Sequence, residues 1–163
     1  MKNLHKFLNL ADIPWVNLIW EKHYQHGPPT DARVGSFLWK AHISLLGDFK
    51  NIMECKVISG ATTLLWQDKW MGEPLYIQFP QLHSFSTNHS ISVRHYHEAD
   101  DSTNNFQLPL CNQAFNQLLQ LDNLFPWLTN SANDQWSHEG KAKFSSIRVY
   151  NSLIPISEEH PIF

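Results

Sequence analysis

The chain has 163 residues, of which 42% are hydrophobic and 13% aromatic, and its formal net charge is −3 with neutral histidine. One domain is the natural expectation at this length, and the mildly acidic balance argues against strong nonspecific binding of nucleic acid by the whole surface. The sequence contains no run of 18 apolar residues and no signal-peptide pattern, so we expect an intracellular protein, cytoplasmic or nuclear, that is neither secreted nor membrane-spanning.

Two helices are predicted near the start of the chain. Apolar residues recur close to helical spacing over residues 2–10. A second helix is predicted over residues 14–25, because Asp12 can cap it and Pro14 suits its first turn. The Gly-Pro-Pro run at residues 27–29 then ends this helix.

A third helix is predicted over residues 36–46. Ser36 is a good N-cap, because its hydroxyl can accept a hydrogen bond from a backbone N–H of the first turn. Apolar residues follow on one face, and Gly47 interrupts this face. With the two earlier helices, this pattern predicts a helical region over residues 1–52.

Residues 54–66 contain two short apolar runs on either side of a turn. Gly60 can supply positive φ in the turn, and the second run is rich in β-branched and aromatic residues, so we predict an antiparallel β-hairpin. Trp66 and Trp70 follow at a spacing of four and would share a face if the chain turned helically there. Such indoles are most often buried, and each buried N–H needs a partner. The hairpin and this tryptophan pair define residues 53–82.

Residues 83–107 are polar and are predicted to form a surface linker. A short helical turn is expected before it, around Pro80, and one short strand or helix is expected within it near residues 91–96. Apolar residues then recur at helical spacing over residues 112–125, and Pro126 ends this helix.

The last part of the chain is predicted to hold a second hairpin and a last helix. The hairpin would turn at residues 138–141, and Ser145 could cap the helix that follows. Residues 108–156 are thus predicted as helix, hairpin and helix. The expected fold is mainly helical α+β with one or two small antiparallel β-hairpins, in a single region that covers residues 1–163.

Few residues could support catalysis or bind a metal. Asp100 and Asp101 form an acidic pair in a polar loop, which we interpret as a solvated turn. His95 and His97 would share one face of a strand and, with Glu98, could bind adventitious zinc or nickel, although a structural zinc site needs four closed ligands. We therefore predict no catalytic residue, no cofactor and no metal site.

The remaining potential metal ligands are isolated from one another in the sequence. Cys55 and Cys111 each lack a second thiol nearby, so neither a disulfide framework nor a Cys-x-x-Cys zinc pair is expected, and a reducing compartment is the default. The other histidines considered are interpreted as surface polar residues, and they are His23, His26, His83, His89 and His138.

Four separated motifs stand out along the chain. In chain order they are A-D-I-P-W-V-N-L-I-W-E-K-x-Y at residues 11–24, G-S-F-L-W-K at 35–40, W-x-D-x-W-x-G at 66–72, and N-D-x-W followed by K-F-S-S-x-x-x-Y within 133–150. Their order resembles the segment of plant non-long-terminal-repeat retrotransposon polyproteins that lies between the reverse-transcriptase polymerase domain and a C-terminal zinc-binding domain. The resemblance covers nearly the whole chain and implies a zinc-binding domain directly after residue 163.

The resemblance implies RNA-directed DNA synthesis by the parent polyprotein. This chain lacks the aromatic-x-Asp-Asp motif of the polymerase and the paired zinc ligands, so we expect it to be non-catalytic and to pack against or position the two neighbouring domains. One alternative is a module that binds RNA or DNA through Trp66, Lys69 and Trp70, helped by nearby lysines. These lysines are Lys40, Lys50 and Lys56. A further alternative is a degraded, non-functional remnant.

Overall fold

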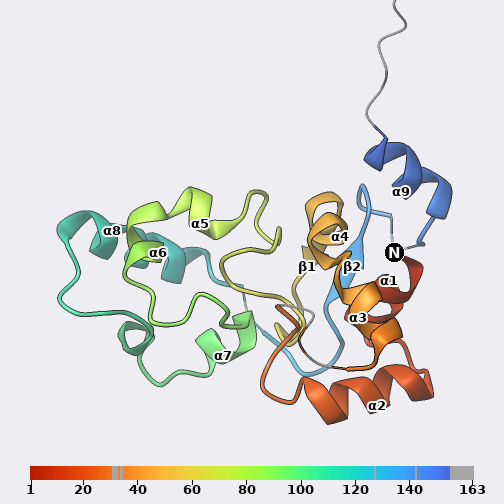
Figure 1. Cartoon of the computed structure of the whole chain (residues 1–163). Helices are drawn as coiled ribbons and strands as arrows, with labels where there is room; N and C mark the ends of the chain where they lie inside the picture. The colour runs from red at the N-terminus through yellow and green to blue at the C-terminus, as the bar shows by residue number, and fades with distance from the viewer. Residues whose placement is uncertain (31–32, 34, 127, 142, 155–163) are drawn as a thin grey trace, which may run out of the picture.

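The computed structural model describes residues 1–30, 33, 35–126, 128–141 and 143–154. Figure 1 shows short helices and one small two-stranded sheet, so the predicted mainly helical α+β class is confirmed. In chain order the elements are α1 (Lys2–Leu8), α2 (Pro14–His23), α3 (Phe37–Ile43), α4 (Leu46–Ile52), β1 (Glu54–Lys56), α5 (Leu75–Gln78), α6 (Pro80–Ser84), α7 (Val93–His97), the 3-10 helix η1 (Ser102–Asn105), α8 (Asn112–Leu124), β2 (Gln135–Ser137) and α9 (Ser146–Leu153).

The sheet joins segments from the two halves of the chain. β1 runs antiparallel to β2, with Cys55 opposite Trp136. The predicted hairpin over residues 54–66 is therefore wrong. Its second apolar run pairs with residues near 91–93 instead, through Leu65 N–H to the Ile91 carbonyl at 2.9 Å and a bridge at Leu64. The β-branched and aromatic residues of this second run predict an extended, buried segment, but they do not identify the segment with which it pairs.

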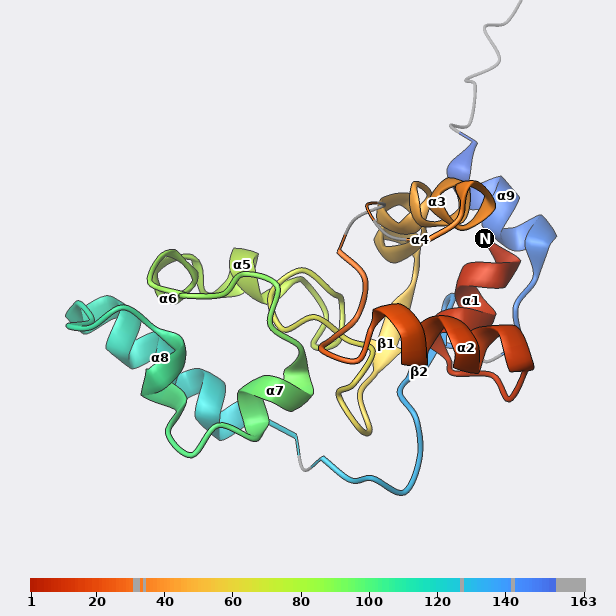
Figure 2. The same cartoon turned by 60° about the horizontal axis from the view of Figure 1, so that its bottom comes forward.

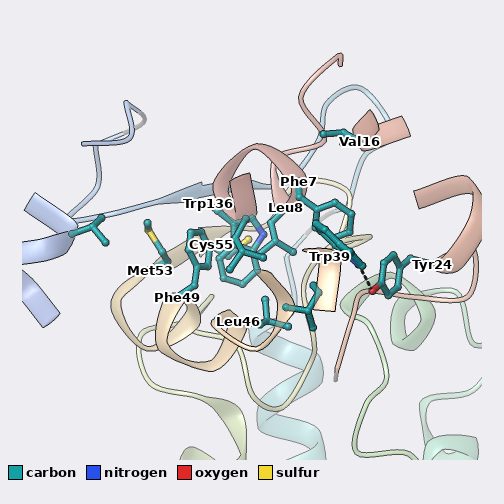
Figure 3. Packing of buried hydrophobic residues seen from close by; sticks show 13 residues of the cluster. Phe7, Leu8, Val16, Tyr24, Trp39, Leu46, Phe49, Met53, Cys55 and Trp136 are labelled. Atoms are coloured by element: carbon teal, nitrogen blue, oxygen red, sulfur yellow. Dashed lines mark hydrogen bonds between the residues drawn. The ribbon is translucent and has the colours of Figure 1, made fainter. Parts of the chain in front are cut away.

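Two hydrophobic clusters divide the molecule into two lobes, which Figure 2 shows side by side. The first lobe contains α1–α4, the sheet and α9, and the second contains α5–α8 with η1. Figure 3 shows the packing of the first cluster, where the Trp39 indole donates a 3.0 Å hydrogen bond to the Tyr24 hydroxyl. Val57 and Trp70 pack against both clusters and so connect the lobes.

The predicted early helices form, with two corrections. Ile13 occupies the N-cap of α2 and makes no side-chain cap, so Asp12 does not have the capping role predicted for it. The helix predicted over residues 36–46 ends at Ile43 in α3, and a separate helix, α4, begins at Leu46 and contains Gly47. Ser36 does cap α3, because its hydroxyl accepts a hydrogen bond from Trp39 N–H at 3.3 Å.

The predicted polar linker over residues 83–107 is more than a surface connection. It contains α7 and buries four apolar side chains in the second cluster. These are Ile91, Val93, Tyr96 and Phe106. Sparse apolar residues in a polar sequence hide a buried face when the segment is irregular, because no sustained period reveals it.

The late helices form where they were predicted, whereas the second hairpin is reduced to a single bridge because its first strand, β2, pairs with β1. α8 spans Asn112–Leu124, and a tight turn at Glu139 and Gly140 is closed by the bridge between His138 and Lys141. Ser145 is the N-cap residue of α9 but makes no side-chain cap. The local signals thus placed these helices well, whereas the detail of each cap depended on the surrounding structure.

Candidate functional site

Trp66, the first residue of the predicted nucleic-acid site, lies in the core. Its side chain is fully buried in the second cluster, and its indole N–H donates to the Ser86 hydroxyl at 3.2 Å. The ring also meets Phe106 edge to face, with centroids 6.3 Å apart. Stacking on a base requires an exposed ring face, so Trp66 cannot form the predicted aromatic platform in this structure.

Asp68, between the two tryptophans, is buried and paired. Its carboxylate accepts a hydrogen bond from Leu64 N–H at 2.7 Å and lies 2.8–2.9 Å from the Lys50 ammonium. The Lys50 side chain is largely buried as well, so its charge is compensated internally. Lys50 is therefore not a free member of the basic face that the sequence suggested.

Lys69 and Trp70 remain nearer the surface. The Lys69 ammonium donates to the Asn51 carbonyl, and the Trp70 indole N–H donates to the Leu65 carbonyl at 2.9 Å. Trp70 is half-buried and meets Phe125 edge to face at 5.7 Å. Both side chains thus already have roles within the fold.

The most extensive polar arrangement surrounds Asp134, which is 1% exposed. Its carboxylate is enclosed by the loop at residues 58–63, which we call the Asp134 loop. Oδ1 accepts hydrogen bonds from the backbone N–H groups of Ile58 (2.9 Å), Ser59 (2.9 Å) and Gly60 (2.7 Å), and Oδ2 accepts from Thr62 N–H (3.0 Å) and from the hydroxyls of Thr62 (3.2 Å) and Thr63 (3.0 Å).

These bonds decide the charge state of Asp134. Burial raises its pKa, but the hydrogen bonds from the Asp134 loop outweigh burial and bring the pKa below its usual value. An ionised carboxylate accepts hydrogen bonds only, which matches a cradle made entirely of N–H and O–H donors. Asp134 therefore acts as the internal anion that orders this loop.

Trp136, two residues further on, extends the same arrangement to α1. Its indole N–H donates to the Thr62 hydroxyl at 3.2 Å, and its backbone N–H donates to the Asn9 side chain at 2.8 Å. The Lys50 ammonium lies 5.5 Å from the centroid of the Trp136 ring. Lys50 thus lies between Asp68 of the W-x-D-x-W-x-G motif and Trp136 of the N-D-x-W motif.

A groove of about 840 Å³ lies along the sheet and is the best candidate surface for a ligand. It is lined by Lys56, Lys69, Trp70 and His5, together with the acidic Glu54. The structure thus brings Lys69 and Trp70 to one groove and separates them from Trp66.

His5 is a polar group on the wall of this groove. Burial lowers its pKa, with a smaller opposing effect of the Trp136 backbone, and its Nε2 lacks a hydrogen-bond partner among the described residues.

The other predicted sites change as well. His95 and His97 lie in helix α7, where residues two apart point to different faces, so they do not have the strand-like arrangement in which they could share an adventitious metal ion. Asp101 caps η1 by accepting from the Thr103 N–H and hydroxyl, which lower its pKa. His138 is buried rather than at the surface, and its Nε2 lies 3.0 Å from the Ser152 hydroxyl.

Across the described part of the chain, no group of three or more histidine, cysteine, aspartate or glutamate residues is placed to hold a metal ion. No helix of the described ranges has the length and apolar character needed to cross a bilayer. Comparison of the chain with protein-family models, with curated proteins and with solved structures found no match.

Sequence reasoning missed the pairing of Asp134 with the Asp134 loop. The partners are more than 70 residues apart, so no local pattern joins them. One signal does exist in the S-G-A-T-T run at residues 59–63, because small residues around a glycine can turn successive N–H groups toward an anion.

Proposed function

We propose that this chain is a non-catalytic packing module, equivalent to the connector between the polymerase and zinc-binding domains of plant non-long-terminal-repeat retrotransposon polyproteins. One observation supports this proposal above the others. Asp134 and Trp136 of one motif and Asp68 of another are bonded to buried groups of the fold, namely Thr62, the Leu64 N–H and Lys50. Motifs whose side chains hold the fold together favour a structural role.

Exposed apolar side chains support a role in packing against neighbours. Phe37 and Leu38 on α3 are 84% and 71% exposed, and Ile147 and Tyr150 on α9 are 74% and 64% exposed. Exposed large apolar side chains of this kind are typical of surfaces that contact another protein. Both helices belong to the first lobe, and their exposed apolar side chains form the proposed contact region.

The proposal can be tested by mixing the chain with a separately purified polymerase domain from a retroelement of the resembling family. We expect one complex in size-exclusion chromatography, and we expect Phe37→Ser with Leu38→Ser to weaken it at least tenfold. Leu18→Ser is the matched control, because Leu18 is 62% exposed on another helix of the same lobe. Separate elution of the unmodified proteins would contradict the proposal.

Nucleic-acid binding is the second candidate, and the groove beside the sheet is the observation that favours it. Lys56, Lys69 and Trp70 line this groove and could contact a phosphate backbone and a base. Salt-sensitive quenching of tryptophan fluorescence by single-stranded RNA, removed by Lys56→Gln and Lys69→Gln, would replace the packing proposal with this one. A chain that shows no cooperative unfolding would favour the degraded remnant instead.

A further inference from the structure

His83 and His89 form a pair of imidazoles that the fold brings into direct contact. His83 Nε2 lies 2.9 Å from His89 Nδ1, and the ring centroids are 4.4 Å apart. His83 comes from α6 and is half-buried, whereas His89 is exposed in the loop that follows. Two nitrogens at this distance share a proton or can share a cation in its place.

The backbone holds both rings in position. Ser86 N–H donates to the His83 carbonyl at 3.0 Å, which turns the chain back after α6. The Gln67 side chain donates to the His89 carbonyl at 2.6 Å. The His83 ring also meets the buried Trp66 ring edge to face, with centroids 5.1 Å apart. The pair is therefore preorganised by groups outside it.

The geometry of the pair matches ligation at a right angle. A cation bonded to imidazole nitrogen at about 2.0–2.1 Å, with the two bonds at about 90°, separates the nitrogens by about 2.9 Å and the ring centroids by about 4.5 Å. A tetrahedral angle between the two bonds would separate the nitrogens by about 3.4 Å and the ring centroids by about 5.1 Å. The observed 2.9 Å and 4.4 Å agree with the first arrangement.

We propose that His83 and His89 form a binding site for a divalent cation that favours right-angled nitrogen ligands, namely Cu²⁺ or Ni²⁺. Imidazole suits both ions, and square-planar or tetragonal coordination is typical of them. Water would complete the coordination.

Calorimetric titration of the whole chain with NiCl₂ tests the site. We expect one strong binding event, weakened at least tenfold in His83→Gln and in His89→Gln. His95→Gln with His97→Gln is the matched control, because these exposed histidines lie on a neighbouring helix and do not share a cation in this geometry. That control should bind Ni²⁺ as the unmodified chain does. Circular dichroism would verify that each variant is folded.

Cu²⁺ provides a second readout through Trp66. A cation on His83 would quench the fluorescence of the adjacent Trp66 indole, and His89→Gln should reduce this quenching without disturbing the core. Ni²⁺ binding that is unchanged in both His83→Gln and His89→Gln, or lost in the control, would show adventitious binding elsewhere and overturn the proposal. No binding by the unmodified chain would overturn it too, by showing that the two rings share only a proton.

Discussion

Single residues matter in this protein chiefly where a charge is buried. Asp68 is neutralised by Lys50, whereas Asp134 is held by backbone N–H groups and two threonine hydroxyls. A buried carboxylate that loses such partners retains the full cost of desolvation. Asp134 should therefore be among the residues least tolerant of substitution.

Asp134→Asn is predicted to lower the free energy of unfolding by about 3 kcal/mol or more at pH 7. The asparagine amide would place N–H donors against the donors of the Asp134 loop, while the charge that strengthens the remaining hydrogen bonds is lost. Urea denaturation measures the change. Asp100→Asn, at an exposed position, is the control and should stay within about 0.5 kcal/mol of the unmodified chain.

The pH dependence of stability in the unmodified chain and in Asp134→Asn provides a further test. The folded pKa of Asp134 lies below the unfolded value of about 3.9, so its contribution to stability is complete above that pH and is lost as the pH falls through the folded pKa. The stability difference between the unmodified chain and Asp134→Asn should therefore narrow below about pH 4. A difference that stays constant down to about pH 2 would contradict the assigned ionisation.

At the scale of elements, the Asp134 loop is held against helix α7. The Arg94 N–H donates to the Gly60 carbonyl at 2.9 Å, and the Arg94 side chain donates to the Ser59 carbonyl at 3.0 Å. Gly60 has φ of +69°, and a Cβ there would lie 2.7 Å from the Arg94 backbone nitrogen. The close approach of loop and helix thus requires glycine.

A comparison of Gly60→Ala with Gly140→Ala separates two requirements at position 60, namely positive φ and the close approach to α7. Both glycines have φ of +69°, but a Cβ at Gly140 would meet no atom within 4 Å. We expect Gly140→Ala to cost about 1 kcal/mol through backbone strain and Gly60→Ala to cost at least about 1 kcal/mol more, since the loop must also move away from α7. Thermal unfolding measures both. Equal losses would show that the contact with α7 does not require glycine.

At the scale of the whole molecule, the two hydrophobic clusters are connected through Val57 and Trp70, which pack against both. Trp70 contacts both clusters, and its ring meets Phe125 from the second lobe while its motif neighbour Asp68 is bound to Lys50 of α4 in the first. Cooperative unfolding of small domains requires that such contacts couple their parts. We therefore expect Trp70 to make the two lobes unfold together.

Trp70→Ala is predicted to destabilise the chain by about 2–4 kcal/mol and to divide its single unfolding transition into two. Trp20→Ala is the matched control, because Trp20 is also half-buried and bonded through its indole but packs against the first cluster alone. Trp20→Ala should lower the midpoint of unfolding while the chain still unfolds in a single transition. Hydrogen exchange along the chain would distinguish the variants, and unchanged coupling in Trp70→Ala would contradict the prediction.

The helices could be predicted from the sequence because their signals are local. Ser36 before an apolar face identified α3, and apolar residues at helical spacing followed by Pro126 identified α8. The sheet could not be predicted, because Cys55 pairs with Trp136 across most of the chain and a run of strand-forming residues does not name its partner. The hairpin prediction failed for this reason.

The candidate site, too, could be predicted from the sequence only in part. Sequence alone pointed to Lys69 and Trp70, which do line a groove, and to Trp66, which the tertiary structure buries against Ser86. It interpreted His83 and His89 as separate surface residues, although the turn after α6 joins them.

Local sequence therefore determined the helical character of this protein, since caps and apolar period act over a few neighbouring residues. The tertiary structure alone decided which charges are buried, which rings are exposed and which histidines meet. Those outcomes depend on contacts between segments far apart in the chain, as in the hydrogen bonds from Thr62 to Asp134.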